Sequence, residues 1–128
     1  MIHGGPVPYA VHGILDYLAG LLLIAAPFVL GYSQLGAPTA VSIVAGVFVL
    51  VLAASTTGPT SLNDALPVSV HVLADLGLGA LFIAAPFLFG FSDEGRPTAL
   101  FIALGVFEVL GVIGTRYPRG ESSRSSVR

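Results

Sequence analysis

The 128-residue chain contains no cysteine, no lysine and few charged residues of any kind. Without cysteine it can form no disulfide and no thiolate-ligated zinc or iron–sulfur centre. Charged residues make up 9% of the chain, whereas an average soluble domain has about 25%. The formal net charge is −2, so no basic surface is available to neutralise phosphates, and a nucleic-acid partner is excluded.

Hydrophobic residues, by contrast, make up 55% of the chain. A soluble domain of this size needs polar groups over most of its surface, and so few charges cannot provide them. The composition therefore indicates an integral membrane protein with the lipid bilayer as its surroundings. Four apolar segments are long enough to span a bilayer as helices, and each begins with a proline, which suits a first helical position. The segments are residues 8–31, 38–57, 67–90 and 97–115.

The placement of arginine predicts the orientation of these spans. Four of the five arginines follow the fourth span, and only Arg96 lies in the last turn. The positive-inside rule therefore predicts a multi-pass protein of the cell (inner) membrane with both termini in the cytoplasm. Residues 1–7 form a short N-terminal segment. The Ser/Arg-rich tail, residues 118–128, has almost nothing to bury and is expected to be disordered.

The chain contains an internal repeat with an offset of 59 residues. Between residues 8–59 and their counterparts, 23 of 52 positions are identical. Because each copy contains two spans, both copies have the same orientation, and an axis along the membrane normal relates them. The predicted fold is an all-α membrane protein of four transmembrane helices. These form two tandem helical hairpins, residues 8–59 and 60–117, related by a pseudo-two-fold axis.

The most similar part of the two repeats is an apolar run followed by proline, an aromatic residue and Leu/Phe-Gly-Tyr/Phe. This pattern resembles the SPW-repeat family of small bacterial integral membrane proteins, whose two-helix unit carries a Ser-Pro-Trp motif. Here the motif reads Ala26-Pro27-Phe28 and Ala85-Pro86-Phe87. The resemblance implies the fold and the membrane location but brings no activity with it.

A polar pair occurs at the same place in both repeats. His12 and Asp16 stand four residues apart and therefore share one helical face, and His71 and Asp75 repeat them. Gly20 continues the first of these faces, and small residues allow membrane helices to approach closely. We therefore expect the first helices of the two repeats to pack together through their glycines, Gly20 and Gly79. The two histidines and two aspartates would then meet at equal depth.

Three interpretations of this constellation remain open. The first is structural: each aspartate accepts a hydrogen bond from the histidine one turn before it, or caps polar groups across the helix pair, and serves packing specificity alone. The second is a haem or a divalent metal ion held by His12 and His71, with the carboxylates nearby. The third is a proton or ion relay through the His–Asp pairs.

Three further positions stand out. Glu108 has no acidic counterpart in the first repeat, where Val49 stands, and its distance along the last span puts it near the membrane midplane. It is either a neutral hydrogen-bonding group at a helix or subunit contact, or a proton or cation site. Pro27 and Pro86 each remove the donor for a carbonyl one turn earlier, at Leu23 and Phe82, and predict helix kinks.

Together these features favour a non-enzymatic function. The loops are too short to form a substrate pocket, and four short helices expose a large lateral surface. The leading prediction is a structural or accessory membrane protein that packs with itself, as a homo-oligomer, or with a larger membrane complex, and has no cofactor. The alternative is a haem- or metal-binding, or proton- or ion-handling, protein that uses the repeated His–Asp faces.

Overall fold

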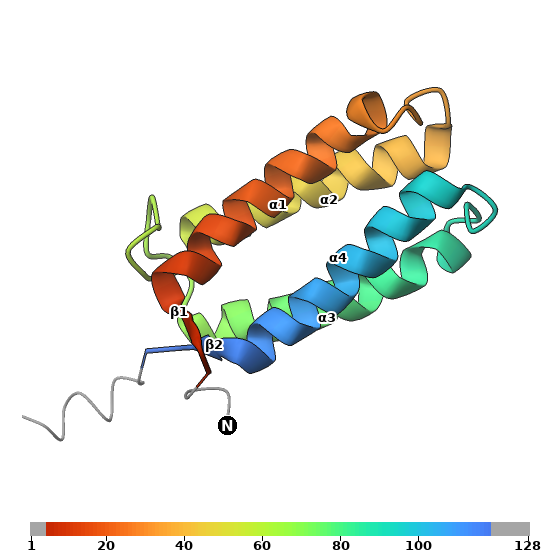
Figure 1. The fold of residues 1–128 in the computed structure, drawn as a ribbon. Coiled ribbons are helices and arrows are strands. Elements are labelled where there is room, and N and C mark those ends of the chain that lie inside the picture. The colour runs from red at the N-terminus through yellow and green to blue at the C-terminus, as the bar shows by residue number, and fades with distance from the viewer. Residues whose placement is uncertain (1–4, 119–128) are drawn as a thin grey trace, which may run out of the picture.

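The computed structural model describes residues 5–118 and shows two helical hairpins lying side by side (Figure 1). Each helix has 20 or 21 residues, about 30 Å at 1.5 Å per residue, which matches the hydrocarbon thickness of a bilayer. All four are long and apolar enough to cross a membrane, so the predicted fold class is confirmed. The helices are α1 (Tyr9–Val29), α2 (Gly36–Ser55), α3 (Val68–Leu88) and α4 (Gly95–Gly114).

The helix ends follow the prolines and glycines of the repeat. Pro8 and Pro67 directly precede α1 and α3, within one residue of the expected starts. However, α2 and α4 begin two residues before their prolines. After α1 and α3 the chain turns at Gly31 and Gly90, whose φ angles of +79° and +75° favour glycine. Apart from Pro118, the predicted tail lies outside the described residues, as do residues 1–4 of the N-terminal segment.

Glycine pairs bring together the two helices within each hairpin. A Cβ added at Gly20 would lie 2.7 Å from Leu50 Cδ2, and one added at Gly46 would lie 2.6 Å from the carbonyl oxygen of Gly20. Gly79 and Gly105 form the equivalent pair between α3 and α4. The expectation that Gly20 and Gly79 join α1 to α3 is therefore wrong. Both glycines face the second helix of their own repeat, because there the backbones approach most closely.

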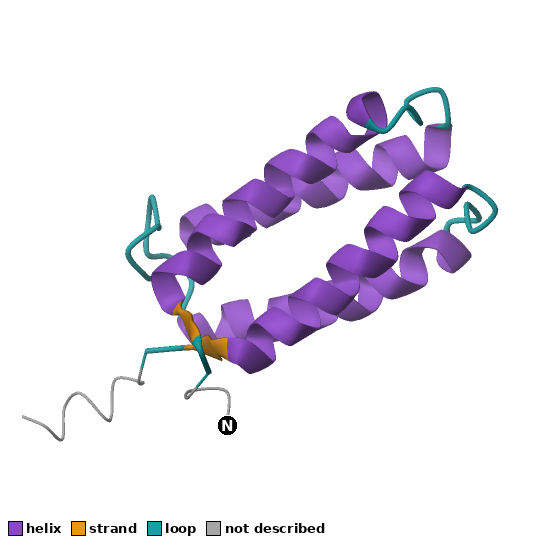
Figure 2. Cartoon of the chain, in the orientation of Figure 1, coloured by secondary structure: helices purple, strands orange, loops and turns teal. Residues whose placement is uncertain are grey.

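The two hairpins are joined at the end of the molecule where the described termini lie (Figure 2). A short strand β1 (Val7–Pro8) pairs in parallel with β2 (Thr115–Arg116), with Val7 opposite Thr115. An isolated bridge between Thr56 and Leu66 is the repeat-equivalent of that pair. The N-terminal segment thus binds the end of α4 much as the entry to α3 binds the end of α2, so the two repeats form a closed pair.

Pro27 and Pro86 lie inside α1 and α3, two residues before each helix ends. The carbonyl of Leu23, which Pro27 leaves without its helical donor, accepts a hydrogen bond of 2.5 Å from the Ser42 hydroxyl of α2. Tyr32 Oη lies 3.1 Å from that hydroxyl oxygen. The freed carbonyl is thus satisfied across the hairpin, as membrane burial requires. Whether the helices kink at these prolines stays a prediction.

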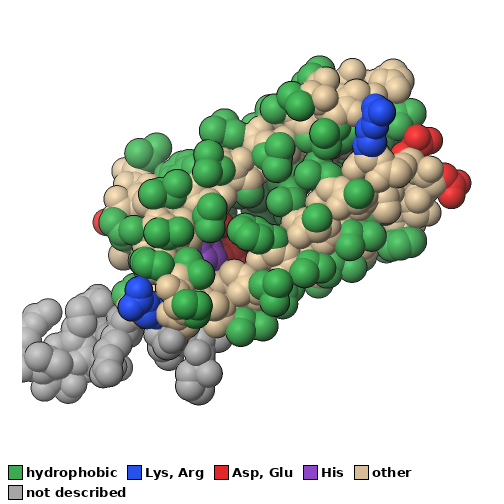
Figure 3. Space-filling view, in the orientation of Figure 1, with side chains coloured by type: hydrophobic (Ala, Val, Ile, Leu, Met, Phe, Trp, Pro, Cys, Tyr) green, Lys and Arg blue, Asp and Glu red, His purple; other side chains and the backbone are tan. Residues whose placement is uncertain are grey.

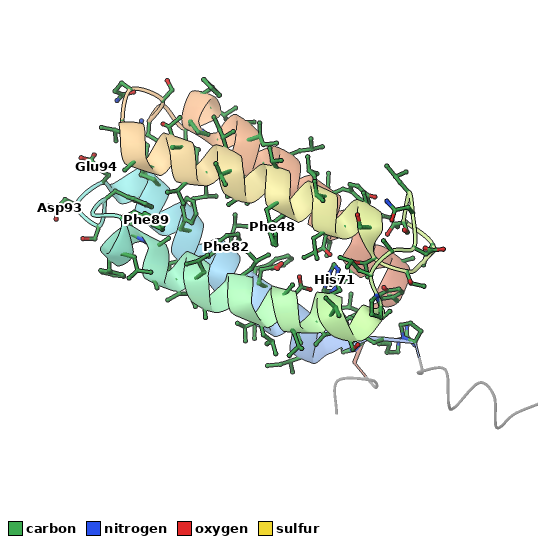
Figure 4. All side chains as sticks on the ribbon, turned by 180° about the vertical axis from the view of Figure 1, so that it is seen from behind. Phe48, His71, Phe82, Phe89, Asp93 and Glu94 are labelled. Carbon is green, nitrogen blue, oxygen red and sulfur yellow. The ribbon has the colours of Figure 1, made fainter. Side chains whose placement is uncertain are left out.

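The outer surface is apolar along the helices and charged at the two ends (Figure 3). Only 28–33% of each apolar span is buried inside the single chain. Between α2 and α3 lies an apolar groove of about 590 Å³ whose lining includes Phe48, Phe82 and Phe89 (Figure 4). At the end away from the termini, Arg96 donates a hydrogen bond to the carbonyl of Leu30 and links the hairpins there. This distribution of side chains fits a protein surrounded by lipid.

Candidate functional site

The structure brings together the two histidines and two aspartates that the repeat singled out. His12 and Asp16 come from the first half of α1, and His71 and Asp75 come from the matching turns of α3. All four are buried, with exposed fractions of 2–6%. One ligand atom from each residue lies within 4.8 Å of the other three. We call this group the His–Asp cluster.

The strongest contacts within the cluster run between the repeats. His12 Nε2 lies 3.0 Å from Asp75 Oδ2, and His71 Nε2 lies 3.0 Å from Asp16 Oδ2. The contacts within each helix are 3.4 Å, from His12 to Asp16, and 3.1 Å, from His71 to Asp75. Each aspartate therefore faces both imidazoles. The structural interpretation allowed partners within one helix or across the helix pair, and the shortest contacts are those across the pair.

Two threonines hold the outer nitrogens of the imidazoles. His71 Nδ1 lies 2.7 Å from Thr56 Oγ1, and His12 Nδ1 lies 2.8 Å from Thr115 Oγ1. Both threonines are buried, at 5% and 0% exposure. Thr56 donates its own proton to the carbonyl of Leu52, at 2.7 Å. Its oxygen therefore accepts from His71, so that Nδ1 carries a proton and Nε2 points into the cluster.

This arrangement fixes what the cluster requires chemically. A neutral His71 with its proton on Nδ1 presents a lone pair at Nε2, and an ionised aspartate presents only lone pairs. At 3.0 Å these groups repel each other unless a positive charge lies between them. Either protons on the imidazoles or a metal cation can supply that charge. In both cases two units of positive charge balance the two aspartates.

The donor geometry suits a single metal ion. In a regular tetrahedral site with bonds of 2.0–2.1 Å, neighbouring ligand atoms lie roughly 3.3 Å apart. The four Nε2–Oδ2 distances in the cluster are 3.0, 3.0, 3.1 and 3.4 Å. Imidazole nitrogens whose second nitrogen is held by a hydrogen-bond partner are the usual form of histidine ligand. All four atoms lie within 4.8 Å of one another. The cluster thus offers the ligand atoms and the outer support that one metal ion needs.

A haem does not fit between the same histidines. The Oδ2 atom of each aspartate lies within 3.4 Å of both Nε2 atoms, in the space that a porphyrin between the two imidazoles would occupy. A porphyrin plane would have to displace these carboxylates. The geometry favours a single ion over a macrocycle.

Aromatic rings and the loop between α2 and α3 surround the outer end of the cluster. The Tyr117 ring lies 5.6 Å from that of His12 and 5.8 Å from that of Tyr9. Tyr9 also donates a hydrogen bond to the carbonyl of Thr57, and Tyr17 donates one to the carbonyl of Thr60. Burial, and then the carboxylates of Asp75 and Asp16, raise the pKa of the Tyr117 phenol above its ordinary value. The Tyr117 side chain is therefore uncharged and lines the outer end of the cluster.

Glu108 lies beside the cluster. It is the fourteenth residue of the 20-residue α4, about 9 Å from the last one, while Asp16 lies about 10 Å from the start of α1. Because these two helix ends lie together, the carboxyl groups of Glu108 and Asp16 share a depth. Glu108 therefore lies nearer the terminal end of the bundle than the predicted midplane position. Glu108 is 9% exposed, and among the described residues its Oε2 atom has no hydrogen-bond partner.

No motif in the sequence assigns Thr56 and Thr115 to the cluster. The sequence does contain one indication of their role, because both threonines occupy the same position of the 59-residue repeat. Threonine at a helix end is common, and only the folded chain places these hydroxyls against the histidines. A polar residue that recurs between diverged repeats is therefore worth weighing even without a motif.

Comparison with known proteins agrees with this architecture. The family model for the SPW repeat domain matches residues 10–114, which include all four helices. The chain belongs to the SPW-repeat family. Within that family this SPW-repeat chain has Ala-Pro-Phe at the motif position of both repeats. Neither the curated proteins nor the solved structures contain a match to it.

Proposed function

We propose that this SPW-repeat protein binds one divalent transition-metal cation of the Zn²⁺ class between its two repeats. One observation carries the proposal: Nε2 of two histidines and Oδ2 of two aspartates face one another within 4.8 Å. Mixed imidazole and carboxylate ligands suit first-row divalent ions. Two ionised aspartates also neutralise a divalent ion, which lowers the cost of burying its charge.

The role we assign is binding rather than catalysis. The cluster lies at the end of the bundle that carries the described termini. The arginine distribution supports a cytoplasmic location for that end in the cell membrane. On this proposal the protein takes its cation from the cytoplasmic side and holds it just below the membrane surface.

The test is a zinc titration of the purified protein in lipid nanodiscs, followed by elemental analysis. We expect one Zn²⁺ per chain. Asp16→Asn and Asp75→Asn each remove one charged ligand, and we expect each to weaken the affinity at least about a hundredfold, more than loss of an outer-shell partner does.

Asp93→Asn is the matched control, because Asp93 is an exposed aspartate at the opposite end of the bundle. It should bind zinc as the unaltered protein does. Zinc binding below one ion per chain, or equal binding by Asp16→Asn, would show that the cluster is a protonated His–Asp network instead.

A second candidate function is assembly within the membrane. The apolar groove between α2 and α3, with Phe48 and Phe82 in its lining, favours this candidate because it can accept side chains of another transmembrane helix. We propose that the protein acts as an accessory subunit, as a homo-oligomer or within a larger complex. Native mass spectrometry from membrane nanodiscs should then recover a defined assembly, and recovery of a lone chain would contradict this role.

A further inference from the structure

A cavity of about 230 Å³ lies between α1 and α4 and reaches the His–Asp cluster. Its lining includes both His12 and Asp16, together with Glu108 and Gly111 of α4. Val7 and Thr115, which join the N-terminal segment to the end of α4, also line it. The space-filling view shows a hollow in this face, with a histidine and acidic side chains visible inside it (Figure 3). Leu15, Phe107 and Leu110 complete the lining, and the last two are exposed on the outer face of α4. The cavity therefore runs from the terminal end of the bundle to the cluster along the seam between α1 and α4.

Glu108 is the group in this cavity that needs an explanation. Its side chain is nine-tenths buried, and its Oε2 atom has no hydrogen-bond partner among the described residues. Buried polar groups in folded proteins are almost always paired, and an unpaired one points to a missing water or ion. The repeat does not account for a carboxyl group here, because its counterpart Val49 is apolar.

Across the pseudo-two-fold axis, the groove between α2 and α3 has an apolar lining with no carboxyl group. At the equivalent positions of α2, Val49 replaces Glu108 and Leu52 replaces Gly111, and both are buried, at 4% and 6% exposure. A Cβ added at Gly111 would lie 3.7 Å from His12 Cε1, so a larger side chain there would extend into the space beside that ring. The cluster is therefore symmetric, whereas the helices beside it present different residues on its two sides.

We propose that this cavity is the entrance through which the divalent cation reaches the cluster, with Glu108 as its first, transient carboxylate ligand. The inference rests on the proposed metal-binding function. The cation enters at the end of the cavity beside Val7 and Thr115, meets Glu108, and passes to the Asp16 and His12 side of the cluster. Glu108 is a positioning residue in this scheme, since it does not hold the bound ion.

The test separates the rate of loading from the equilibrium affinity. Stopped-flow mixing of Zn²⁺ with the full chain in nanodiscs, and release to a fluorescent chelator, give the two rates. Clefts lined by acidic groups raise the association rate of a cation by about 10- to 1000-fold, and Glu108 and Asp16 both line this cavity. For Glu108→Val and Glu108→Gln we therefore expect both rates to fall at least about tenfold. One Zn²⁺ per chain and an unchanged dissociation constant should remain.

Gly111→Leu copies Leu52, the residue at the equivalent position of α2, and should slow loading in the same way. Ala103→Leu adds the same side chain at an exposed position of α4 and should load at the unaltered rate. If Gly111→Leu fails to fold, Glu108→Gln, which keeps the size of the side chain, decides the question.

The outcomes distinguish this inference from the function on which it rests. If the unaltered protein binds zinc and both Glu108 variants load at its rate, the entrance is wrong and the metal site stands. If Glu108→Gln loses stoichiometric binding at equilibrium, Glu108 is a ligand of the bound ion and the entrance role is again wrong. If the unaltered protein binds no zinc, both proposals fall.

Discussion

At the scale of single residues, two hydroxyl groups determine how the histidines of the cluster present themselves. Thr56 and Thr115 contact the Nδ1 atoms and leave the Nε2 atoms directed at the aspartates. Ser42 has a comparable role elsewhere, because its hydroxyl satisfies the carbonyl that Pro27 leaves without a donor. None of these residues is charged, yet each decides whether a buried group has a partner.

Replacing Thr56 or Thr115 by valine should weaken zinc binding about 10- to 100-fold, because each histidine loses the hydrogen bond that orients its ring. The size of the side chain is almost unchanged, so the fold should remain. Calorimetric titration with Zn²⁺ measures the effect. Thr57→Val is the control, since Thr57 is exposed and contacts the Leu66 carbonyl instead. Equal affinities for Thr56→Val and Thr57→Val would contradict a supporting role.

Ser42→Ala should lower the free energy of unfolding by about 1–3 kcal/mol, because the buried carbonyl of Leu23 loses its donor. In a Pro27→Ala background the backbone N–H of residue 27 can bond that carbonyl, and the cost should shrink. Unfolding in mixed detergent micelles measures both. Ser69→Ala, at an exposed position of α3, should be neutral. An equal cost of Ser42→Ala in both backgrounds would show that the hydroxyl does not serve this carbonyl.

At the scale of helices, each hairpin is held by a pair of glycines that lets two backbones approach. The pairs are Gly20 with Gly46 and Gly79 with Gly105. Within a bilayer, where lipid tails are as apolar as leucine, such close packing takes the place of the hydrophobic effect. Each repeat therefore contains a glycine pair for close helix packing as well as a His–Asp pair.

Gly46→Ala should destabilise the protein by about 1–3 kcal/mol, because the added methyl group forces α1 away from α2. Gly77→Ala is the control, since a Cβ there would meet nothing within 4 Å. That change should be neutral or stabilising by up to about 1 kcal/mol through helix propensity. Thermal unfolding in detergent compares the two. Similar destabilisation by both substitutions would mean that close approach at Gly46 is unimportant.

At the scale of the whole molecule, the His–Asp cluster is a polar link between two hairpins that are otherwise joined by apolar contacts, the paired strands and Arg96. Each histidine contacts the aspartate of the other repeat. A cation bound there would receive two ligands from each hairpin. Metal binding and association of the repeats are then coupled.

A chain divided between Leu62 and Asn63, in the connection between the hairpins, tests this coupling. Leu62 is 82% exposed, so the two halves should still fold and pair. Zn²⁺ at a hundred times its dissociation constant should strengthen their association about a hundredfold, as measured by native mass spectrometry. Halves carrying Asp16→Asn and Asp75→Asn should show no zinc effect. A zinc effect that survives in those halves would place the ion outside the cluster.

Composition and the internal repeat are enough to predict a multi-pass membrane protein, its four helices and an equal depth for the cluster residues of the two repeats. Apolar length sets the spans, because the bilayer demands about 20 such residues for each helix. The 59-residue repeat places His12 level with His71 and Asp16 level with Asp75, since equal sequence positions in parallel copies lie at equal depths.

Which helix faces pack against one another depends on the tertiary structure. From the sequence, Gly20 could pack against α2 or α3. In the structure it packs against α2, because the two backbones of the hairpin approach most closely there. The partners of each histidine depend on the rotation of α1 relative to α3, which periodicity within one helix cannot define. The position of Glu108 beside the cluster also depends on the tertiary structure. The cavity that Glu108 lines forms only when α4 packs against α1 with Gly111 between them.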